Sequence, residues 1–203
     1  MYDDLTETEL TRPAPCVRTA ETLATSLLTG VGTRLAHTRT VAAHAATVRD
    51  ILPEPWRSAL VPAAWLHDIG YASKIAILRF HPLDGARYLV DRGWTREICG
   101  LVAWHSGAGE EARLRLLDHR LVEEFDEPDW LALAALSWAD LTSSPTGEEV
   151  SAPERIAEIL TRYEPGSIVH AAVTSSRPAL LEMASVVEIA LDMRQTADKR
   201  AAS

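Results

Sequence analysis

Apolar residues recur at intervals of three and four along most of this chain, in segments that proline or glycine brings to an end. In the segment from Leu35 to Leu52, which Pro53 ends, the apolar positions fall on one side of an α-helix. The segment from Trp56 to His67 is apolar at most positions, as in a helix that is buried on all sides. Alternating apolar and polar runs joined by hairpin turns, which are typical of β-strands, are missing. The sequence therefore predicts an all-α fold.

The same signals predict further helices downstream. Pro82 lies just inside a helix start, a position that proline prefers, and Thr95 is a favourable cap for the next helix. We expect the last helical region to have a boundary or kink at Pro178, because proline lacks the N–H that a helix interior requires. The predicted helices after residue 80 span Pro82 to Gly93, Thr95 to Ser106, Asp129 to Leu141, Pro153 to Tyr163 and Ile168 to Met193.

A chain of 203 residues suits a single domain, and no repeat, low-complexity linker or shift in composition divides it. Residues 1–16 are acidic and contain two prolines, which predicts a loose N-terminal lead-in. Residues 17–193 carry the helical periodicity and are expected to form the domain. Residues 194–203 lose this periodicity, which predicts a flexible tail.

Composition and charge exclude several classes of partner. The formal net charge of −9 argues against a broad surface for a nucleic-acid polymer or an anionic membrane, although a small anionic substrate is compatible with it. The longest apolar stretch, Ala59 to Leu66, is far shorter than the ~18–20 residues of a membrane-spanning helix. The N-terminus has no signal-peptide pattern, and Cys16 and Cys99 form no CxxC pair. We expect a cytoplasmic protein with reduced thiols and no membrane partner.

The dipeptide His67-Asp68 is the most informative local feature. It follows a run of alanine, tryptophan and leucine, so an imidazole and a carboxylate stand at the end of an apolar helix. Burying a carboxylate is costly unless it is paired or binds a metal. We expect Gly70 to end this helix and the fraying last turn to bring the two side chains together. From these residues alone two interpretations stay open, a metal site and a hydrogen bond between Asp68 and His67.

Four further histidine and aspartate residues favour the metal site. His37 shares a helix face with apolar residues, and Asp140 lies at the inner end of an apolar helix. His105 follows the end of another apolar helix, and His81 precedes a proline. Imidazole and carboxylate donors without thiolates suit Mn, Fe, Co, Ni, Zn or Mg. The remaining histidines are expected to be structural or surface residues: His44, His119 and His170.

The order His37 … His67-Asp68 … Asp140 resembles the H…HD…D signature of the HD-domain superfamily of metal-dependent phosphohydrolases. The resemblance covers residues 34–142 and implies a single-domain, HD-type helical bundle with a buried metal site. The predicted domain at residues 17–193 would then be HD-like, with its motif core at residues 34–142. The matching segments are Arg34-x-x-His37, His67-Asp68-Ile69-Gly70, His81-Pro82-Leu83-Asp84-Gly85-Ala86 and Ala139-Asp140.

The resemblance also implies a set of metal ligands. His81 and His105 stand where branches with two metals place the ligands of a second ion, with Asp68 bridging the two ions. The implied cofactor is one or two divalent ions of Mn, Fe, Co, Ni, Zn or Mg. The ligands implied for the first ion are His37, His67, Asp68 and Asp140.

The implied activity is hydrolysis of a phosphate monoester or diester by a water molecule that the metal activates. We expect Asp68 to be catalytic, by taking the proton of this water. Arg34 and Lys74 are the cations nearest to the motif in sequence, and we expect them to bind the phosphate. The expected partner is a small phosphorylated molecule, a nucleotide or a related metabolite, and not a nucleic-acid polymer.

Residues around the doublet differ from those of the best-known branches of the superfamily. Tyr71, Ala72 and Trp104 stand where branches acting on cyclic di-GMP, alarmones or 5′-deoxynucleotides carry lysine, acidic residues and histidine. The substrate is therefore left open. Two other functions also stay open, a di-iron oxygenase of HD type and a non-catalytic, metal-binding regulatory module. The state of assembly is open as well, a homodimer included.

Overall fold

The computed structural model describes residues 16–201, and within this range it consists of helices and connecting loops without a β-strand. Ser143 and Glu149 form one isolated antiparallel bridge. The predicted all-α fold is confirmed. The predicted lead-in lies outside the described residues except for Cys16. The elements are α1 (Val17–Leu28), α2 (Arg34–Val48), η1 (Arg49–Ile51), α3 (Trp56–Leu66), η2 (Ile69–Tyr71), α4 (His81–Val90), α5 (Arg96–Trp104), η3 (His105–Gly107), α6 (Ala108–Leu114), α7 (Asp118–Glu124), α8 (Trp130–Leu141), α9 (Ala152–Arg162) and α10 (Ile168–Ala201).

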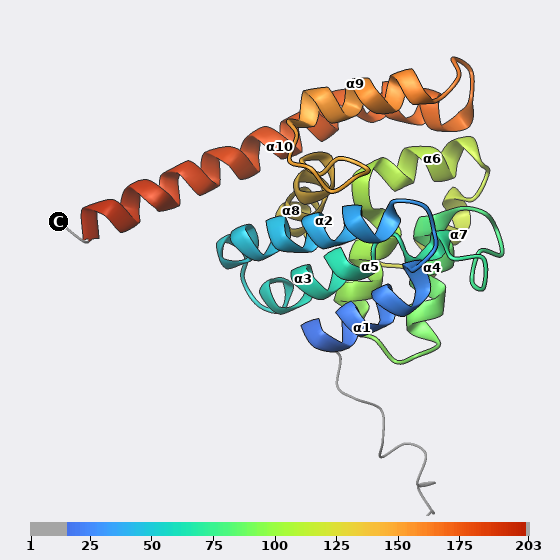
Figure 1. Cartoon of the computed structure of the whole chain (residues 1–203), viewed down its shortest axis with the longest axis horizontal. Helices are drawn as coiled ribbons and strands as arrows, with labels where there is room; N and C mark the ends of the chain where they lie inside the picture. Colours follow the sequence, from blue (N-terminus) through green and yellow to red (C-terminus); the bar gives the residue numbers. More distant parts are fainter. Residues whose placement is uncertain (1–15, 202–203) are drawn as a thin grey trace, which may run out of the picture.

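Helix α3 lies in the interior of the bundle, in contact with α1, α2, α5 and α8 (Figure 1). Its residues from Ala59 to Ala64 are all buried, as expected for a helix that is apolar on every side. The alanines let neighbouring helices approach closely. Helix α8 is also largely buried from Ala132 to Ala139. The doublet follows the end of α3 and Asp140 lies near the end of α8, so two interior helices deliver their polar residues to one region.

Local sequence determines several helix starts. The side chain of Thr95 accepts a hydrogen bond from the N–H of Ile98, which confirms the predicted cap of α5. Pro82 lies in the first turn of α4, as predicted. Ser151 and Glu154 form a capping box at the start of α9, in which each side chain accepts from the other's backbone N–H.

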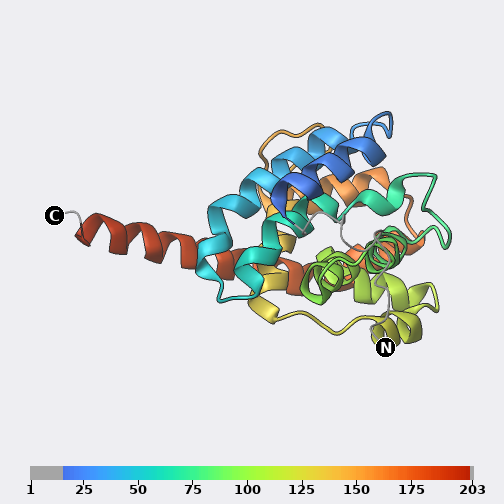
Figure 2. The same cartoon turned by 90° about the horizontal axis from the view of Figure 1, so that it is seen from below.

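The C-terminal region packs across the core as a pair of helices. Helix α9 lies beside the first part of α10, and α10 also contacts α8 and α6 (Figures 1 and 2). A small apolar cluster of its own connects this pair to the end of α8. The sequence assigned no role to this region, and the structure places it over one side of the bundle. The buried residues of the cluster are Leu141, Ala152, Ile156, Leu180 and Ala184.

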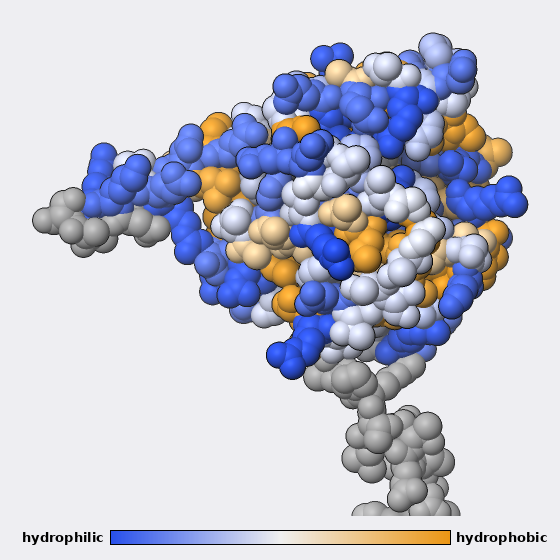
Figure 3. All heavy atoms as spheres, in the orientation of Figure 1, coloured by the Kyte–Doolittle hydropathy of each residue, from blue (hydrophilic) through white to orange (hydrophobic). Residues whose placement is uncertain are grey.

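Helix α10 is one helix from Ile168 to Ala201. Of the two predicted alternatives at Pro178, a boundary or a kink, the structure excludes the boundary. The predicted tail differs from the prediction, because it is helical up to Ala201. Residues 194–201 contain neither proline nor glycine, and the cations Lys199 and Arg200 suit a helix C-terminus. This end of α10 projects from the bundle, and hydrophilic residues dominate its visible face (Figures 2 and 3). Residues 202–203 lie outside the described range.

Three helices were not predicted individually: α1, α6 and α7. Helix α1 buries Ala20, Ala24 and Leu28, which lie four residues apart and therefore on one face. None of the helices in the described part of the chain is both long and apolar enough to cross a lipid bilayer.

Candidate metal centre

The His67-Asp68 doublet lies immediately after the end of α3 at Leu66. Asp68 has φ −100° and ψ 2°, and the chain then enters the short helix η2. This change of direction brings the two side chains together, with His67 Nε2 3.6 Å from Asp68 Oδ2. Both residues are buried, at 0% and 2% exposure. The doublet therefore presents an imidazole and a carboxylate to one point in the interior.

Gly70 has a different role from the one that the sequence suggested. It lies within η2 after the end of α3, and its backbone is not in the left-handed region. A Cβ atom at this position would lie 2.0 Å from the backbone oxygen of His81. Any side chain here would therefore collide with the start of α4. Glycine is required because it lets His81 approach the doublet.

Asp68 is the group that most of the predicted ligands face. Its Oδ2 accepts a hydrogen bond from Arg34 Nη1 at 2.7 Å and lies 3.9 Å from His37 Nε2. Its Oδ1 lies 3.5 Å from His81 Nε2. Burial alone would raise the pKa of Asp68, but the positive charge of Arg34 opposes burial, and this pKa is held well below its usual range. The carboxylate is therefore ionised at neutral pH, as cation binding requires.

Three of the histidines are oriented by backbone carbonyl groups. Because a carbonyl oxygen only accepts hydrogen bonds, the proton must be on Nδ1, and in the neutral ring Nε2 offers a lone pair. The Nε2 atoms of His67 and His105 can therefore bind a metal directly, and that of His37, which faces the carboxylate of Asp140, can do so once it has released its proton. The pairs are His67 Nδ1 with Ala64 O at 2.7 Å, His105 Nδ1 with Val102 O at 2.7 Å, and His37 Nδ1 with Ser144 O at 3.1 Å.

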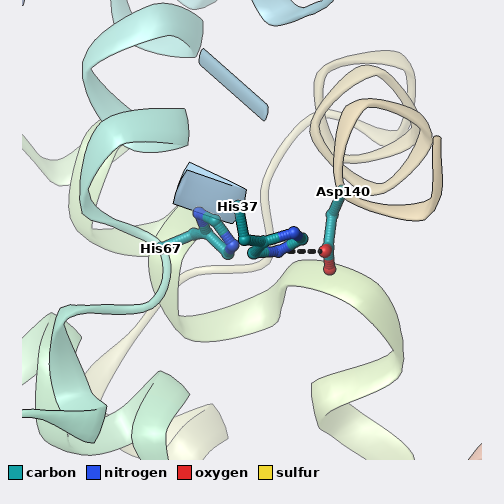
Figure 4. Close-up of side chains that lie close together, drawn as sticks. All are labelled: His37, His67 and Asp140. Carbon is teal, nitrogen blue, oxygen red and sulfur yellow. Dashed lines mark ion pairs between the residues drawn. The ribbon is translucent and has the colours of Figure 1, made fainter. Parts of the chain in front are cut away.

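The Nε2 atom of His67 has no hydrogen-bond partner among residues 16–201, although the side chain is fully buried. A buried polar atom without a partner is rare and costly, and a bound ligand removes that cost. Figure 4 shows His67, His37 and Asp140 directed toward one another from three different elements. The donor atoms of these three residues lie within 4.8 Å of one another, and so do those of His67, Asp68 and His105. This donor set fits a divalent cation.

Asp140 is held from two sides. Its Oδ1 lies 3.0 Å from His37 Nε2, and its Oδ2 accepts a hydrogen bond from Ser106 Oγ at 2.5 Å. Burial would raise the pKa of Asp140, but the hydrogen bond and charge of His37 hold it well below its usual range. Burial would likewise lower the pKa of His37, yet the hydrogen bond and charge of Asp140 raise it. Ser106 adopts φ 49° and ψ 42°, a strained left-handed conformation that places its hydroxyl group on Asp140.

The loop after α8 fixes the orientation of His37. Ser144 in this loop supplies the carbonyl group that accepts from His37 Nδ1. The loop turns at Gly147, which has φ 87° and where a Cβ would lie 2.9 Å from the backbone oxygen of Ala36. The carbonyl of Gly147 accepts a hydrogen bond from Thr40 Oγ1 at 2.7 Å. The loop is therefore packed tightly against α2 beneath His37.

His81 and His105 face each other, with their Nε2 atoms 3.3 Å apart. Burial lowers the pKa of both rings, and the charges of neighbouring imidazoles lower it further. Both rings are therefore neutral near neutral pH, the form that binds a metal. The ring of Tyr71 stacks on His81 at 4.1 Å, and the guanidinium of Arg34 lies 3.8 Å above Tyr71. The structure thus brings all six predicted ligands together.

A cavity of about 100 Å³ is lined by four of these ligands, Asp68, His81, His105 and Asp140. Arg34 lines it, whereas Lys74, the second cation expected to bind phosphate, is exposed and does not line it. Lys74 follows η2 in a surface turn. His44, His119 and His170 also lie outside the lining, in agreement with their expected structural or surface roles. The cavity residues that sequence reasoning missed are Ser106, Ala108, Glu111, Arg155, Ile159, Arg162, Tyr163, Val169 and Val173.

A sequence model of the HD domain matches residues 34–164, which is more than half of the chain. The chain belongs to the HD domain family. Comparisons with curated proteins and with solved structures give no match. The HD domain superfamily consists mostly of metal-dependent phosphohydrolases. In this HD domain the match begins at Arg34, contains all six candidate ligands and extends beyond residue 142 through α9.

Proposed function

We propose that this HD domain hydrolyses a phosphate ester of a small molecule, a nucleotide or a related phosphorylated metabolite, with one or two divalent metal ions. The observation that carries the proposal is the lone pair of His67 Nε2, which is buried and lacks a partner within the described part of the chain. If His67 only formed a hydrogen bond at the end of α3, its buried Nε2 would stay without a partner and would lower the stability of the fold. If His67 binds a metal, Nε2 has a partner and this cost is removed.

Six side chains would hold the metal. Asp68 would be shared between the two ions, because its two oxygens face different histidines: His37 Nε2 lies near Oδ2 and His81 Nε2 lies near Oδ1. The proposed ligands of one ion are His37, His67, Asp68 and Asp140, and those of the other are Asp68, His81 and His105. The metal could be Mn, Fe, Co, Ni, Zn or Mg.

When bound, a divalent ion lowers the pKa of a water molecule and stabilises the charge that develops on the phosphoryl oxygens. The residues of the chain position the reacting groups. Asp68 lines the cavity, so its carboxylate would be within reach of the attacking water and would receive the proton of that water. Ser106 and His37 keep Asp140 in a single orientation. Arg34 holds Asp68 and lines the same cavity.

The proposal limits the substrate to a small molecule. The cavity is narrow, and α9 and the start of α10 form part of its wall. Ile159, Val169 and Val173 make this wall apolar, which suits the organic part of an ester and reduces the access of bulk water. The acidic surface of the protein disfavours a nucleic-acid polymer.

The test is release of inorganic phosphate from a panel of nucleotides and phosphorylated metabolites. Metal-free protein would be assayed with Mn, Fe, Co, Ni, Zn and Mg in turn. We expect metal-dependent release from at least one ester, and a loss of about 100-fold or more in Asp68→Asn. Asp126→Asn is the matched control, because Asp126 is an exposed carboxylate paired with Arg96 outside the cavity. Its activity should equal that of the wild type.

Absence of phosphate release from every ester with every metal would overturn the proposal. Oxygen uptake by the iron-loaded protein under these conditions would favour the di-iron oxygenase. Tight metal binding without either activity would favour the regulatory module. A loss of activity that is equal in Asp68→Asn and Asp126→Asn would also contradict the role given to Asp68.

A further inference from the structure

One wall of the cavity is formed by a helix that supplies none of the candidate metal ligands. Helix α9 presents Arg155, Ile159 and Arg162 to the cavity. These residues are spaced by four and three positions, so they lie on one face of the helix. Val169 and Val173 of α10 extend the apolar part of the same wall. The wall therefore carries two cations with an apolar surface between them, opposite the carboxylates and imidazoles of the metal centre.

Arg155 is an unusual arginine because it is 5% exposed. Its Nη1 is paired with Glu158, but its Nε has no hydrogen-bond partner in the described range. A buried N–H donor without an acceptor is costly, and the side chain lines the cavity. Arg155 lines the same cavity as the candidate ligands Asp68, His81, His105 and Asp140. The donor is therefore available to a ligand that lies close to these residues.

The arginines of α9 share one carboxylate. Glu158 is paired with Arg155 and also lies 3.3 Å from Arg162 Nε, so it serves two guanidinium groups. The three carboxylates that line the cavity have other partners: Asp68 is bound to Arg34, Glu111 to Arg115 and Asp140 to His37. A divalent ion held by Asp68 and Asp140 would offset their negative charge, so an anionic ligand beside α9 would be favoured.

We propose that Arg155 and Arg162 form an anion-binding subsite that holds the non-bridging oxygens of the substrate's phosphoryl group. Ile159, Val169 and Val173 would then contact the organic part of the ester. The planar guanidinium group suits this role, because its N–H groups can bind two phosphoryl oxygens at once. This inference rests on the proposed function and assigns phosphate binding to α9, where Lys74 had been expected to provide it. Both arginines would contact the substrate directly.

The test is calorimetric titration of inorganic phosphate into the metal-loaded protein and into the metal-free protein. Methionine replaces arginine with a similar length and no charge. We expect phosphate to bind Arg155→Met at least about 10-fold more weakly than the wild type, and Arg162→Met also more weakly, because charge-assisted hydrogen bonds are lost. Arg155→Lys keeps the charge but lacks the planar pair of N–H groups, so its affinity for phosphate should be intermediate. Arg177→Met is the matched control, because Arg177 is exposed on α10 outside the lining and its loss should change nothing.

The outcomes separate this inference from the proposed function. Equal phosphate affinity in the wild type, Arg155→Met and Arg162→Met, or no phosphate binding by the wild type, overturns the subsite even if esters are hydrolysed. Weaker binding in both variants supports the subsite even if no ester is hydrolysed, in which case only the proposed function fails. If circular dichroism shows that Arg155→Met is unfolded, Arg162→Met decides, because the side chain of Arg162 is 36% exposed and tolerates replacement.

Discussion

The guanidinium of Arg34 donates a hydrogen bond from Nη1 to Oδ2 of Asp68 at 2.7 Å, which joins the start of α2 to the turn after α3. The carboxylate of Asp68 is 3% exposed, so it depends on this partner when no metal is bound. We predict that Arg34→Met lowers the free energy of unfolding of the metal-free protein by about 3 kcal/mol in chemical denaturation. A bound divalent ion would itself compensate Asp68, so the deficit should shrink in the metal-loaded protein.

Arg39→Met is the control for this prediction, because Arg39 lies on the same helix and is exposed. Its stability should stay within about 0.5 kcal/mol of the wild type. A deficit in Arg34→Met that is no larger than in Arg39→Met would show that Asp68 does not depend on Arg34.

Gly70→Ala should be among the most damaging substitutions in the chain. The new Cβ would lie 2.0 Å from the backbone oxygen of His81, and a backbone atom cannot move away as a flexible side chain can. We predict a loss of about 3 kcal/mol or more in the free energy of unfolding, together with weaker metal binding. Gly109→Ala is the comparison, because its nearest neighbour is the side chain of Trp104 at 3.3 Å and its effect should stay below about 1 kcal/mol. Similar stability of the two variants would contradict the close approach.

Ser106 can be tested with two substitutions that differ in one property. Ser106→Ala and Ser106→Gly both remove the hydroxyl group that donates to Asp140, so both should weaken metal binding by about 10-fold. Only glycine adopts φ 49° without steric cost, so Ser106→Gly should be more stable than Ser106→Ala by about 1 kcal/mol. Metal titration and thermal unfolding of the two variants provide the readouts. Unchanged metal affinity in both would mean that the hydroxyl group does not orient Asp140.

The two cysteines should differ sharply in reactivity. Cys16 is exposed, and its hydrogen bond with Thr19 lowers the pKa of its thiol. Cys99 is 2% exposed, and burial raises the pKa of its thiol to about 12. Because the thiolate is the reactive form, a thiol reagent at about pH 8 should label one thiol quickly in the folded chain and the second only after denaturation. Cys16→Ser should abolish the fast reaction. Fast labelling of both thiols in the folded protein would contradict the burial of Cys99.

The sequence was sufficient to predict the helical fold and the candidate ligands. Spacing of apolar residues by three and four identifies α2, and nearly continuous apolar runs identify α3 and α8, which are buried in the interior. Asp68 and Asp140 could be predicted as metal ligands because a carboxylate at the end of a buried apolar helix is shielded from water and needs a cationic partner. The approach of His37, His81 and His105 to these two carboxylates depends on how the helices pack. The resemblance to the HD signature implied this approach, and the structure shows the packing.

The remaining features depend on contacts between distant segments. Arg155 lies on an amphipathic helix, where an arginine normally faces solvent, and its burial results from the packing of α9 over the cavity. Gly70 follows a helix and was interpreted as its cap, because the approach of His81 leaves no mark in the local sequence. Lys74 is near the doublet in sequence, but the turn after η2 places it outside the cavity.

Metal binding by His67 underlies both the proposed metal centre and the proposed activity. It can be tested by titration of the metal-free protein with Mn(II) or Zn(II), followed by elemental analysis of the bound metal, for the wild type, His67→Ala and His119→Ala. His119 is exposed outside the cluster and serves as the control. We predict one or two ions per chain in the wild type and in His119→Ala, and affinity weaker by about 100-fold or more in His67→Ala. No bound ion in the wild type, or equal affinity in His67→Ala, would contradict it.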